Sequence, residues 1–226
     1  SITISSELSR TAFAMPLRGS WYLGAGPTPH SHHRWAAMEE FADDFVRFGA
    51  NNRTHRGDGA RLSDYYAYGQ PVLAAAAGVI AATADSEAED AHAMRQPGET
   101  QDAYMSRVGA DQSARLARGL VGIVGNYIVI DHGNGEYSVY AHLKPGSVRV
   151  RAGQRVSQGH LLGAVGSSGN STEPHLHFQV CNSADPLMCA GIPPHWVGLN
   201  QVGDDFDRAP QTGDFISGAN PAPATP

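Results

Sequence analysis

The 226-residue chain has few charged residues and almost no lysine. Charged side chains make up 17% of it, against about 25% in an average soluble domain, and all basic residues except Lys144 are arginine. The formal net charge of −6 provides no excess of positive charge for binding nucleic acid or an anionic membrane. The longest apolar run, 71–82, is too short and too rich in alanine to span a bilayer. We therefore expect no nucleic-acid partner and no membrane-spanning segment.

Cysteine is also scarce, with only Cys181 and Cys189, which lie in a stretch rich in turn-forming residues. Two cysteines cannot form a four-ligand zinc site by themselves. A local disulfide, which implies an oxidising compartment, is the favoured interpretation, and two unrelated buried thiols are the alternative. The chain begins without Met and shows no charged start followed by an apolar segment, so we expect a mature or trimmed product that carries no signal peptide.

Glycine and proline are instead abundant, with 26 and 14 of the 226 residues. Their combined share of the chain exceeds the usual share of about 12%. Short alternating apolar segments between them predict an all-β or β-rich fold with an antiparallel sheet as its core. The clearest case is residues 126–143, where two alternating segments flank Asn134-Gly135, a strong hairpin signal. Residues 85–120 differ, because they are charged, rich in alanine and helix-prone, and they predict a helical insertion.

The same patterns predict the domain organisation. Residues 1–30 are turn-rich and are expected to form an irregular lead-in. Residues 31–198 form the main domain, with the insertion at 85–120, and residues 199–226 are expected to form a flexible tail because they are acidic and rich in Gly and Pro. The insertion either narrows a cleft in the domain or is a spacer without contact to the site.

The most informative local motif is His175-Leu176-His177. On a strand, residues two apart point to the same face, so both imidazoles would lie side by side while Leu176 faces the core. Imidazole is the commonest biological metal ligand, and two on one face suit zinc. The alternative is two surface histidines on a half-buried strand.

Other segments add residues of the same kind. By alternation, Tyr140 and His142 at the end of the hairpin would share one face. His33 and the pair Asp43-Asp44 lie near the start of the domain. A zinc hydrolase needs three ligands from neutral histidine and carboxylate, an open position for water, and further groups that handle protons and oxyanion charge. The sequence contains this set on predicted β elements.

These residues belong to longer segments that resemble zinc endopeptidases of the M23 type, the lysostaphin-like and LytM-like cell-wall peptidases. The resemblance is carried by HRWAAMEEFADDF, YYAYGQPVLAAAAGVI and an almost continuous segment from GNYIVIDHG through YAHL and the VxxGQxVxxGxxLGxxGxSG hairpin to PHLHF. It covers 33–82 and 121–180, about half of the chain. It implies the antiparallel, lysostaphin-like fold known as the duplicated hybrid motif.

Carried over residue by residue, the resemblance assigns the metal ligands to His33, Asp44 and His177. His142 and His175 match the two family histidines that act in catalysis beside the water. One zinc ion per chain is implied, and it would activate a water molecule for attack on a peptide bond.

Alternatives remain for several of these positions. The spacing between the first histidine and the aspartate is longer than the common family spacing, so His32 or His30 could replace His33. Asp43 is the alternative to Asp44 and is otherwise expected to be a solvated carboxylate at a sheet edge. Tyr140 is expected to pack rather than react, and His195 is a candidate for the rim of the cleft.

The resemblance implies a zinc-dependent endopeptidase that hydrolyses peptide bonds of bacterial cell-wall peptidoglycan, outside the cell or in the periplasm. The alternative is a non-catalytic regulatory or binding module on the same fold. A third interpretation, a biotinyl- or lipoyl-like carrier domain, needs a lysine at a hairpin tip, whereas Lys144 precedes the hairpin. Either His142 or His175 could act as the general base.

Overall fold

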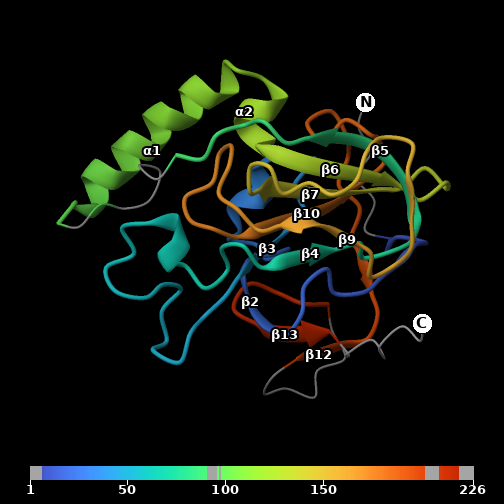
Figure 1. Cartoon of the computed structure of the whole chain (residues 1–226), viewed down its shortest axis with the longest axis horizontal. Helices are drawn as coiled ribbons and strands as arrows, with labels where there is room; N and C mark the ends of the chain where they lie inside the picture. Colours follow the sequence, from blue (N-terminus) through green and yellow to red (C-terminus); the bar gives the residue numbers. More distant parts are fainter. Residues whose placement is uncertain (1–6, 91–95, 97, 202–208, 219–226) are drawn as a thin grey trace.

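The computed structural model describes residues 7–90, 96, 98–201 and 209–218 (Figure 1). Strands dominate this part of the chain: β1 (Ala12–Phe13), β2 (Ser20–Ala25), β3 (Asp43–Val46), β4 (Pro71–Leu73), β5 (Gly78–Ala84), β6 (Asn126–Asp131), β7 (Tyr137–Leu143), β8 (Arg155–Val156), β9 (Leu161–Ala164), β10 (Leu176–Cys181), β11 (His195–Trp196), β12 (Leu199–Gln201) and β13 (Phe215–Gly218). The helical segments are the 3-10 helices η1 (His32–Trp35) and η2 (Leu62–Asp64) and the α-helices α1 (Gln101–Leu116) and α2 (Leu120–Val124). None of the described helices combines the length and the apolar character that crossing a membrane requires.

Nine strands form one sheet in the order β12-β13-β2-β3-β10-β7-β6-β5-β8, and its neighbouring strands are antiparallel. Two small sheets accompany it, an antiparallel pair of β4 with β9 and a parallel pair of β1 with β11. The predicted β-rich antiparallel fold is therefore confirmed. β10 lies in the middle of the large sheet, between β3 and β7, so it brings together segments that are far apart in sequence.

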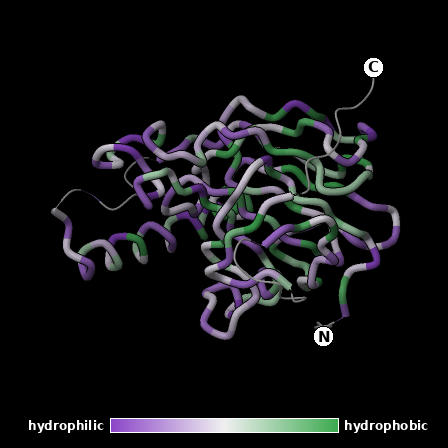
Figure 2. The backbone as a smooth tube through the Cα atoms, turned by 90° about the horizontal axis from the view of Figure 1, so that it is seen from below, coloured by the Kyte–Doolittle hydropathy of each residue, from purple (hydrophilic) through white to green (hydrophobic). Residues whose placement is uncertain are grey.

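The large sheet buries side chains on both of its faces, and Figure 2 shows hydrophobic stretches running through the main body of the molecule. In β6, Ile128 and Ile130 join the larger apolar cluster, which is rich in aromatic residues, while Tyr127 and Val129 join a second cluster that includes the two cysteines. Because successive side chains of a strand point to opposite faces, these clusters lie on opposite sides of the sheet. Burial on both sides explains why the strand reads as a continuous apolar run.

The structure corrects the description expected for residues 1–30 and 199–226. β2 pairs with β3, and β13 pairs with β2, so segments from both regions belong to the nine-stranded sheet. Trp21 and Leu23 of β2 are buried in the larger apolar cluster. The glycines and prolines around β2 hid this alternation in the sequence. Residues 1–6, 202–208 and 219–226 lie outside the described part.

The insertion contains the predicted helices, but it is not helical throughout. α1 begins at Gln101 and is capped by Thr100, whose side chain accepts a hydrogen bond from the backbone N–H of Ala103 at 3.2 Å. This helix extends away from the sheet (Figure 1), and most of its residues are exposed. Before it, Glu89 forms a β-bridge with Ser168, and its carboxylate accepts a hydrogen bond from the backbone of Ser167 at 2.8 Å. The insertion therefore contacts the loop that precedes β10.

Phe178 lies at the centre of the aromatic cluster, and its removal is the sharpest test of this core. Its ring lies 5.7 Å from that of Phe13, 5.3 Å from that of Tyr140 and 5.0 Å from that of Trp196. We expect Phe178→Ala to lower the free energy of unfolding by about 3–5 kcal/mol, because it leaves a cavity in a close-packed site. Chemical denaturation measures this loss. Phe215→Ala is the matched control, since Phe215 is 40% exposed, and should cost less than half as much; equal losses would contradict the assignment of the core.

Candidate metal centre

The pairing of β3 with β10 places a carboxylate opposite an imidazole. In this antiparallel register Asp44 is the direct partner of His177, so both side chains lie on the same face of the sheet. His175 lies just before β10 and bridges to Gly166. His33 comes from the 3-10 helix η1, whose Ser31 side chain accepts a hydrogen bond from the backbone N–H of His33. Strand register and a helical turn thus bring together residues from both ends of the main domain.

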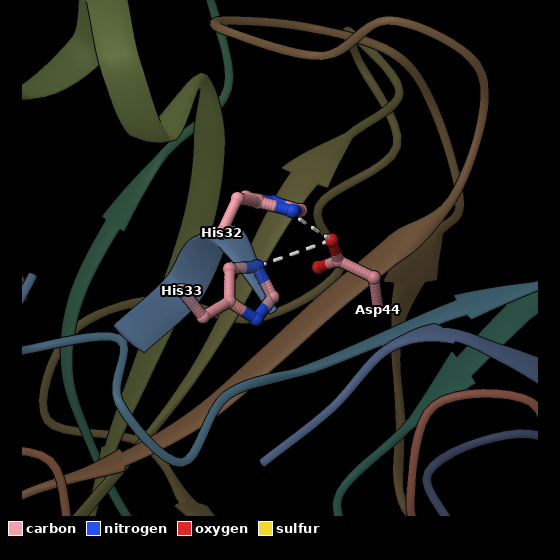
Figure 3. Close-up of side chains that lie close together, drawn as sticks. All are labelled: His32, His33 and Asp44. Carbon is pink, nitrogen blue, oxygen red and sulfur yellow. Dashed lines mark ion pairs between the residues drawn. The ribbon is translucent and has the colours of Figure 1, made fainter. Parts of the chain in front are cut away.

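Asp44 is the centre of this group. Its Oδ1 lies 2.9 Å from Nδ1 of His177 and 3.5 Å from Nε2 of His175. Its Oδ2 lies 3.1 Å from Nε2 of His33 and 3.8 Å from Nε2 of His32, as Figure 3 shows for the two histidines of η1. The Asp44 residue is only 9% exposed. The arrangement surrounds one buried carboxylate with imidazole nitrogens.

Backbone carbonyls determine which nitrogen three of the histidines direct into the site. Nδ1 of His33 lies 3.1 Å from the carbonyl of Ala42, and Nδ1 of His175 lies 2.8 Å from that of Glu173. A carbonyl oxygen only accepts, so each Nδ1 carries a proton and Nε2 is the nitrogen that faces the site. His142 follows the same rule, with its Nδ1 donating to the carbonyl of a residue in the loop before β10, at 2.8 Å. Such anchoring of the distant nitrogen is the usual support of a metal-ligating histidine.

His142 reaches the site because β7 contains a bulge. Tyr140 and Leu143 of β7 pair with Ile128 and Asn126 of β6. Two residues separate the pair in β7, whereas only one separates their partners in β6. His142 has a φ of 59°, which is unusual for a residue other than glycine. A bulge of this kind redirects side chains, so Tyr140 and Leu143 both enter the aromatic cluster while His142 turns to the other face. The expectation that Tyr140 and His142 share a face is therefore wrong.

The ring positions place His142 and His175 beside the other histidines. The ring centroids of His142 and His175 are 4.8 Å apart, and those of His33 and His177 are 5.2 Å apart. The ring of His142 lies 5.8 Å from that of His177. All four are nearly buried, with exposed fractions of 2% to 8%. Asp44, His33 and His177 can thus offer one oxygen and two nitrogen ligands, with two further imidazoles next to them.

Burial and mutual charge shift the pKa values in opposite directions. Burial raises the pKa of Asp44, but the charges of His175 and His33 and hydrogen bonds from the histidines outweigh it and hold the pKa well below its usual range. Burial lowers the pKa of His177, whereas the hydrogen bond and charge of Asp44 raise it to about 9. Burial, followed by the neighbouring charges of His175 and His177, lowers the pKa of His142 well below 6.5. At neutral pH, the metal-free protein therefore has a positively charged His177 ring and a neutral His142 ring.

The alternatives considered for the ligands differ in burial. His32, His33 and Asp44 form the compact cluster of potential metal ligands found among the described residues. The His32 side chain is 71% exposed, whereas that of His33 is 2% exposed. His30 is exposed at the end of the preceding turn. These differences favour His33 as the anchored ligand.

Asp43 is not the solvated edge carboxylate that was expected. It is 2% exposed, and Nε1 of Trp196 donates a hydrogen bond to its Oδ2 at 3.2 Å. Burial raises its pKa well above the usual value. Asp43 is the neighbour of Phe178 in the β3–β10 register and not of His177, so it lies away from the imidazoles. His195, the candidate for the rim, lies on β11 and pairs with Ala12.

Three structural features support the site. Cys181 and Cys189 form a disulfide with an S–S distance of 2.11 Å. Gln179, which sequence reasoning missed, accepts a hydrogen bond from Nε2 of His177 at 2.7 Å. The signal was present in the alternation of β10, since residues 177, 179 and 181 share one face. Asn126, buried at the start of β6, donates to the carbonyl of Leu143 at 3.1 Å and so holds the end of the bulged strand.

Comparison with known proteins adds independent information. The profile of the family described as "Peptidase family M23" matches residues 63–188, more than half of the chain. The matched range contains His142, His175 and His177 and begins after His33 and Asp44.

The peptidoglycan DD-endopeptidase ShyA of Vibrio cholerae is 42% identical over 71 residues, which cover 30% of this chain and 16% of ShyA. The cell division protein DipM of Caulobacter vibrioides is 39% identical over 71 residues, 31% of this chain and 11% of DipM. The chain thus spans less than a fifth of either relative. A crystal structure of a zinc containing peptidase from Vibrio cholerae is 18% identical, with 81% of this chain and 40% of that chain covered and a TM-score of 0.44.

The pairing of His177 with Asp44 predicts how stability depends on pH when a chelator keeps the site free of metal. The pKa of His177 is about 9 in the folded protein, against 6.5 as its ordinary value. Its stabilising contribution is fully present below about pH 6.5 and is lost as the pH rises through 9. We expect the midpoint of thermal unfolding to fall between pH 6.5 and 9.5, and His177→Gln to reduce this fall. The same fall in His177→Gln as in the wild type would contradict the assignment, and His160→Gln, an exposed histidine, is the control.

Proposed function

The chain belongs to peptidase family M23, and we propose that it is a zinc-dependent endopeptidase that hydrolyses peptide bonds of bacterial cell-wall peptidoglycan. The observation that carries this proposal is the pairing of Asp44 with His177 across β3 and β10, with the anchored His33, His142 and His175 around it. A structural role alone does not require four buried imidazoles around one carboxylate.

The chemistry of these donors fits zinc. His33, Asp44 and His177 would hold one zinc ion per chain, since two imidazoles and one carboxylate are a common ligand set of catalytic zinc sites. Nitrogen donors do not suit calcium or magnesium, which prefer oxygen ligands throughout. Free Nε2 lone pairs on the anchored histidines are the form that binding a metal needs. When bound, zinc would lower the pKa of a coordinated water towards about 7 and polarise the carbonyl of the scissile bond.

His142 and His175 would handle protons and charge in the reaction. Each holds its ring by an Nδ1–H bond to a backbone carbonyl, at 2.8 Å in both cases, so Nε2 is the atom that meets substrate and water. The low pKa of His142 keeps its ring neutral at pH 7 and able to accept a proton. One ring would orient the attacking water, and the other would stabilise the developing oxyanion and pass a proton to the leaving amine.

The substrate and the compartment are proposed from two further observations. The names of the curated relatives refer to peptidoglycan endopeptidases and to cell division, which supports a cell-wall peptide as substrate. The disulfide between Cys181 and Cys189 supports action outside the cell or in the periplasm, because disulfides persist in oxidising compartments.

The first experiment combines metal content with hydrolysis. We expect about one zinc per chain by elemental analysis and release of muropeptides from purified cell walls, measured by liquid chromatography and mass spectrometry. His177→Ala should lose both. His142→Ala and His175→Ala should keep zinc but lose hydrolysis by a factor of about 10²–10⁴, the usual contribution of a general acid or base.

His160→Ala is the control in this experiment, since His160 is exposed in a turn. Protein that contains no zinc after purification without chelator would contradict the proposal. Zinc without release of any cell-wall peptide would favour a regulatory or binding module on the same fold.

A second experiment separates the two histidines of η1. The side chain of His33 is 2% exposed and anchored by Ala42, whereas that of His32 is 71% exposed. His33→Ala should therefore raise the dissociation constant of zinc at least 100-fold, and His32→Ala should change it less than about fivefold. Competition with a chromophoric chelator measures both constants. The reverse order would assign the ligand to His32.

A further inference from the structure

We propose that Gln179 is a positioning residue that selects which nitrogen His177 presents to the metal. The inference rests on the proposed function in one respect, the assignment of His177 as a ligand. His177 differs from the other buried histidines, because its Nδ1 and not its Nε2 faces Asp44, at 2.9 Å. Its other nitrogen, Nε2, faces the side chain of Gln179 and not a backbone carbonyl, at 2.7 Å from Oε1.

The surroundings of Gln179 determine the orientation of its amide. The residue is 4% exposed, and its Nε2 donates to the carbonyl of Pro186 at 3.2 Å and to Sγ of Cys181 at 3.1 Å. A carbonyl oxygen can only accept, so the NH2 group must face Pro186. Oε1 then faces His177 and accepts from it.

This orientation decides the position of the proton on His177. Because Oε1 of Gln179 only accepts, Nε2 of His177 carries a proton and Nδ1 is the nitrogen left for a metal. Without Gln179, a neutral His177 ring could carry its proton on Nδ1 and donate it to Asp44. In that hydrogen bond, Nδ1 of His177 and the carboxylate of Asp44 would bind each other and would not be available to the metal. Gln179 therefore disfavours the tautomer that competes with metal binding.

The disulfide loop supports this arrangement from behind. Pro186 lies between Cys181 and Cys189, so the disulfide closes the loop that supplies the carbonyl for Gln179. Gly191, two residues after Cys189, donates its backbone N–H to the carbonyl of Ala37 at 2.8 Å. Ala37 lies in the segment that follows His33. The loop thus connects the strand of His177 with the region of the other histidine ligand.

The test compares Gln179→Leu with Gln179→Glu, which keeps an acceptor opposite Nε2 of His177. Gln158→Leu is the matched control, because Gln158 is an exposed glutamine whose amide donates to the backbone of Ala75. We expect Gln179→Leu to weaken zinc binding about 10–100-fold, the usual effect of losing a partner of a metal-ligating histidine. Gln179→Glu should bind zinc within about threefold of the wild type, as should Gln158→Leu. Competition with a chromophoric chelator gives the dissociation constants.

A second readout follows the proton itself. Long-range proton–nitrogen correlation NMR of zinc-free protein at pH 10 should show a larger share of the Nε2-protonated tautomer of His177 in the wild type and in Gln179→Glu than in Gln179→Leu, where the Nδ1-protonated tautomer should dominate. Unchanged zinc affinity together with an unchanged tautomer in Gln179→Leu would overturn the proposal. A wild-type protein that binds no zinc would contradict the proposed function instead, while the NMR measurement would still decide the role of Gln179.

The contribution of the loop is tested by a double-mutant cycle, and its Gln179→Glu arm also applies if Gln179→Leu fails to fold. Replacing Cys181 and Cys189 by serine should weaken zinc binding less than Gln179→Leu does, because the loop acts through the amide. Gln179→Glu in the serine background should then restore affinity to within about threefold of the wild type. Additive losses on combining Gln179→Leu with the serine replacements would show that the loop acts independently of Gln179, and would overturn this part of the proposal.

Discussion

The site depends on one interaction, the contact between the buried carboxylate of Asp44 and the imidazoles around it. A carboxylate that is 9% exposed is costly to ionise unless positive charge or hydrogen-bond donors surround it. His177 supplies a donor at 2.9 Å, and His33 and His175 lie at 3.1 and 3.5 Å. A bound cation would meet the same requirement. This contact constrains the large sheet, because only one register of β3 and β10 places Asp44 opposite His177.

Backbone carbonyl groups around the histidines then fix the orientation of their rings. The carbonyls of Ala42 and Glu173 hold two rings, and the loop before β10 holds the ring of His142. Side chains that are anchored in this way lose little freedom when a ligand arrives, which is the basis of preorganisation. The bulge in β7 belongs to the same design, because a regular strand would have turned His142 into the aromatic core.

Much of this could be predicted from the sequence, and the rest has physical reasons for being hidden. Alternation and the Asn134-Gly135 turn predicted the central hairpin, and the spacing of His175 and His177 predicted that both face one side of a strand. The direction of His142 could not be predicted, because a positive φ at a residue other than glycine leaves no local signal. The burial of Asp43 depends on Trp196, which lies 153 residues away.

The strands from the two ends of the chain were missed for a related reason. β2 and β13 are stabilised by partners that are distant in sequence, and their glycine-rich surroundings resemble loops. The assignment of the ligand residues themselves came from the resemblance of short motifs to the M23 peptidases. Pairing distances in the fold then separate His33 from His32 in a way that spacing alone did not.

The wide separation of Asp44 and His177, two of the proposed ligands, has a consequence for the order in which the site assembles during synthesis and folding. Asp44 and His177 lie 133 residues apart, and contacts of such long range form late in folding because closing the intervening loop costs entropy. A nascent chain that has emerged only as far as β7 has Asp44 without its central partner. Synthesis and folding therefore delay the assembly of the proposed metal centre until β10 is available.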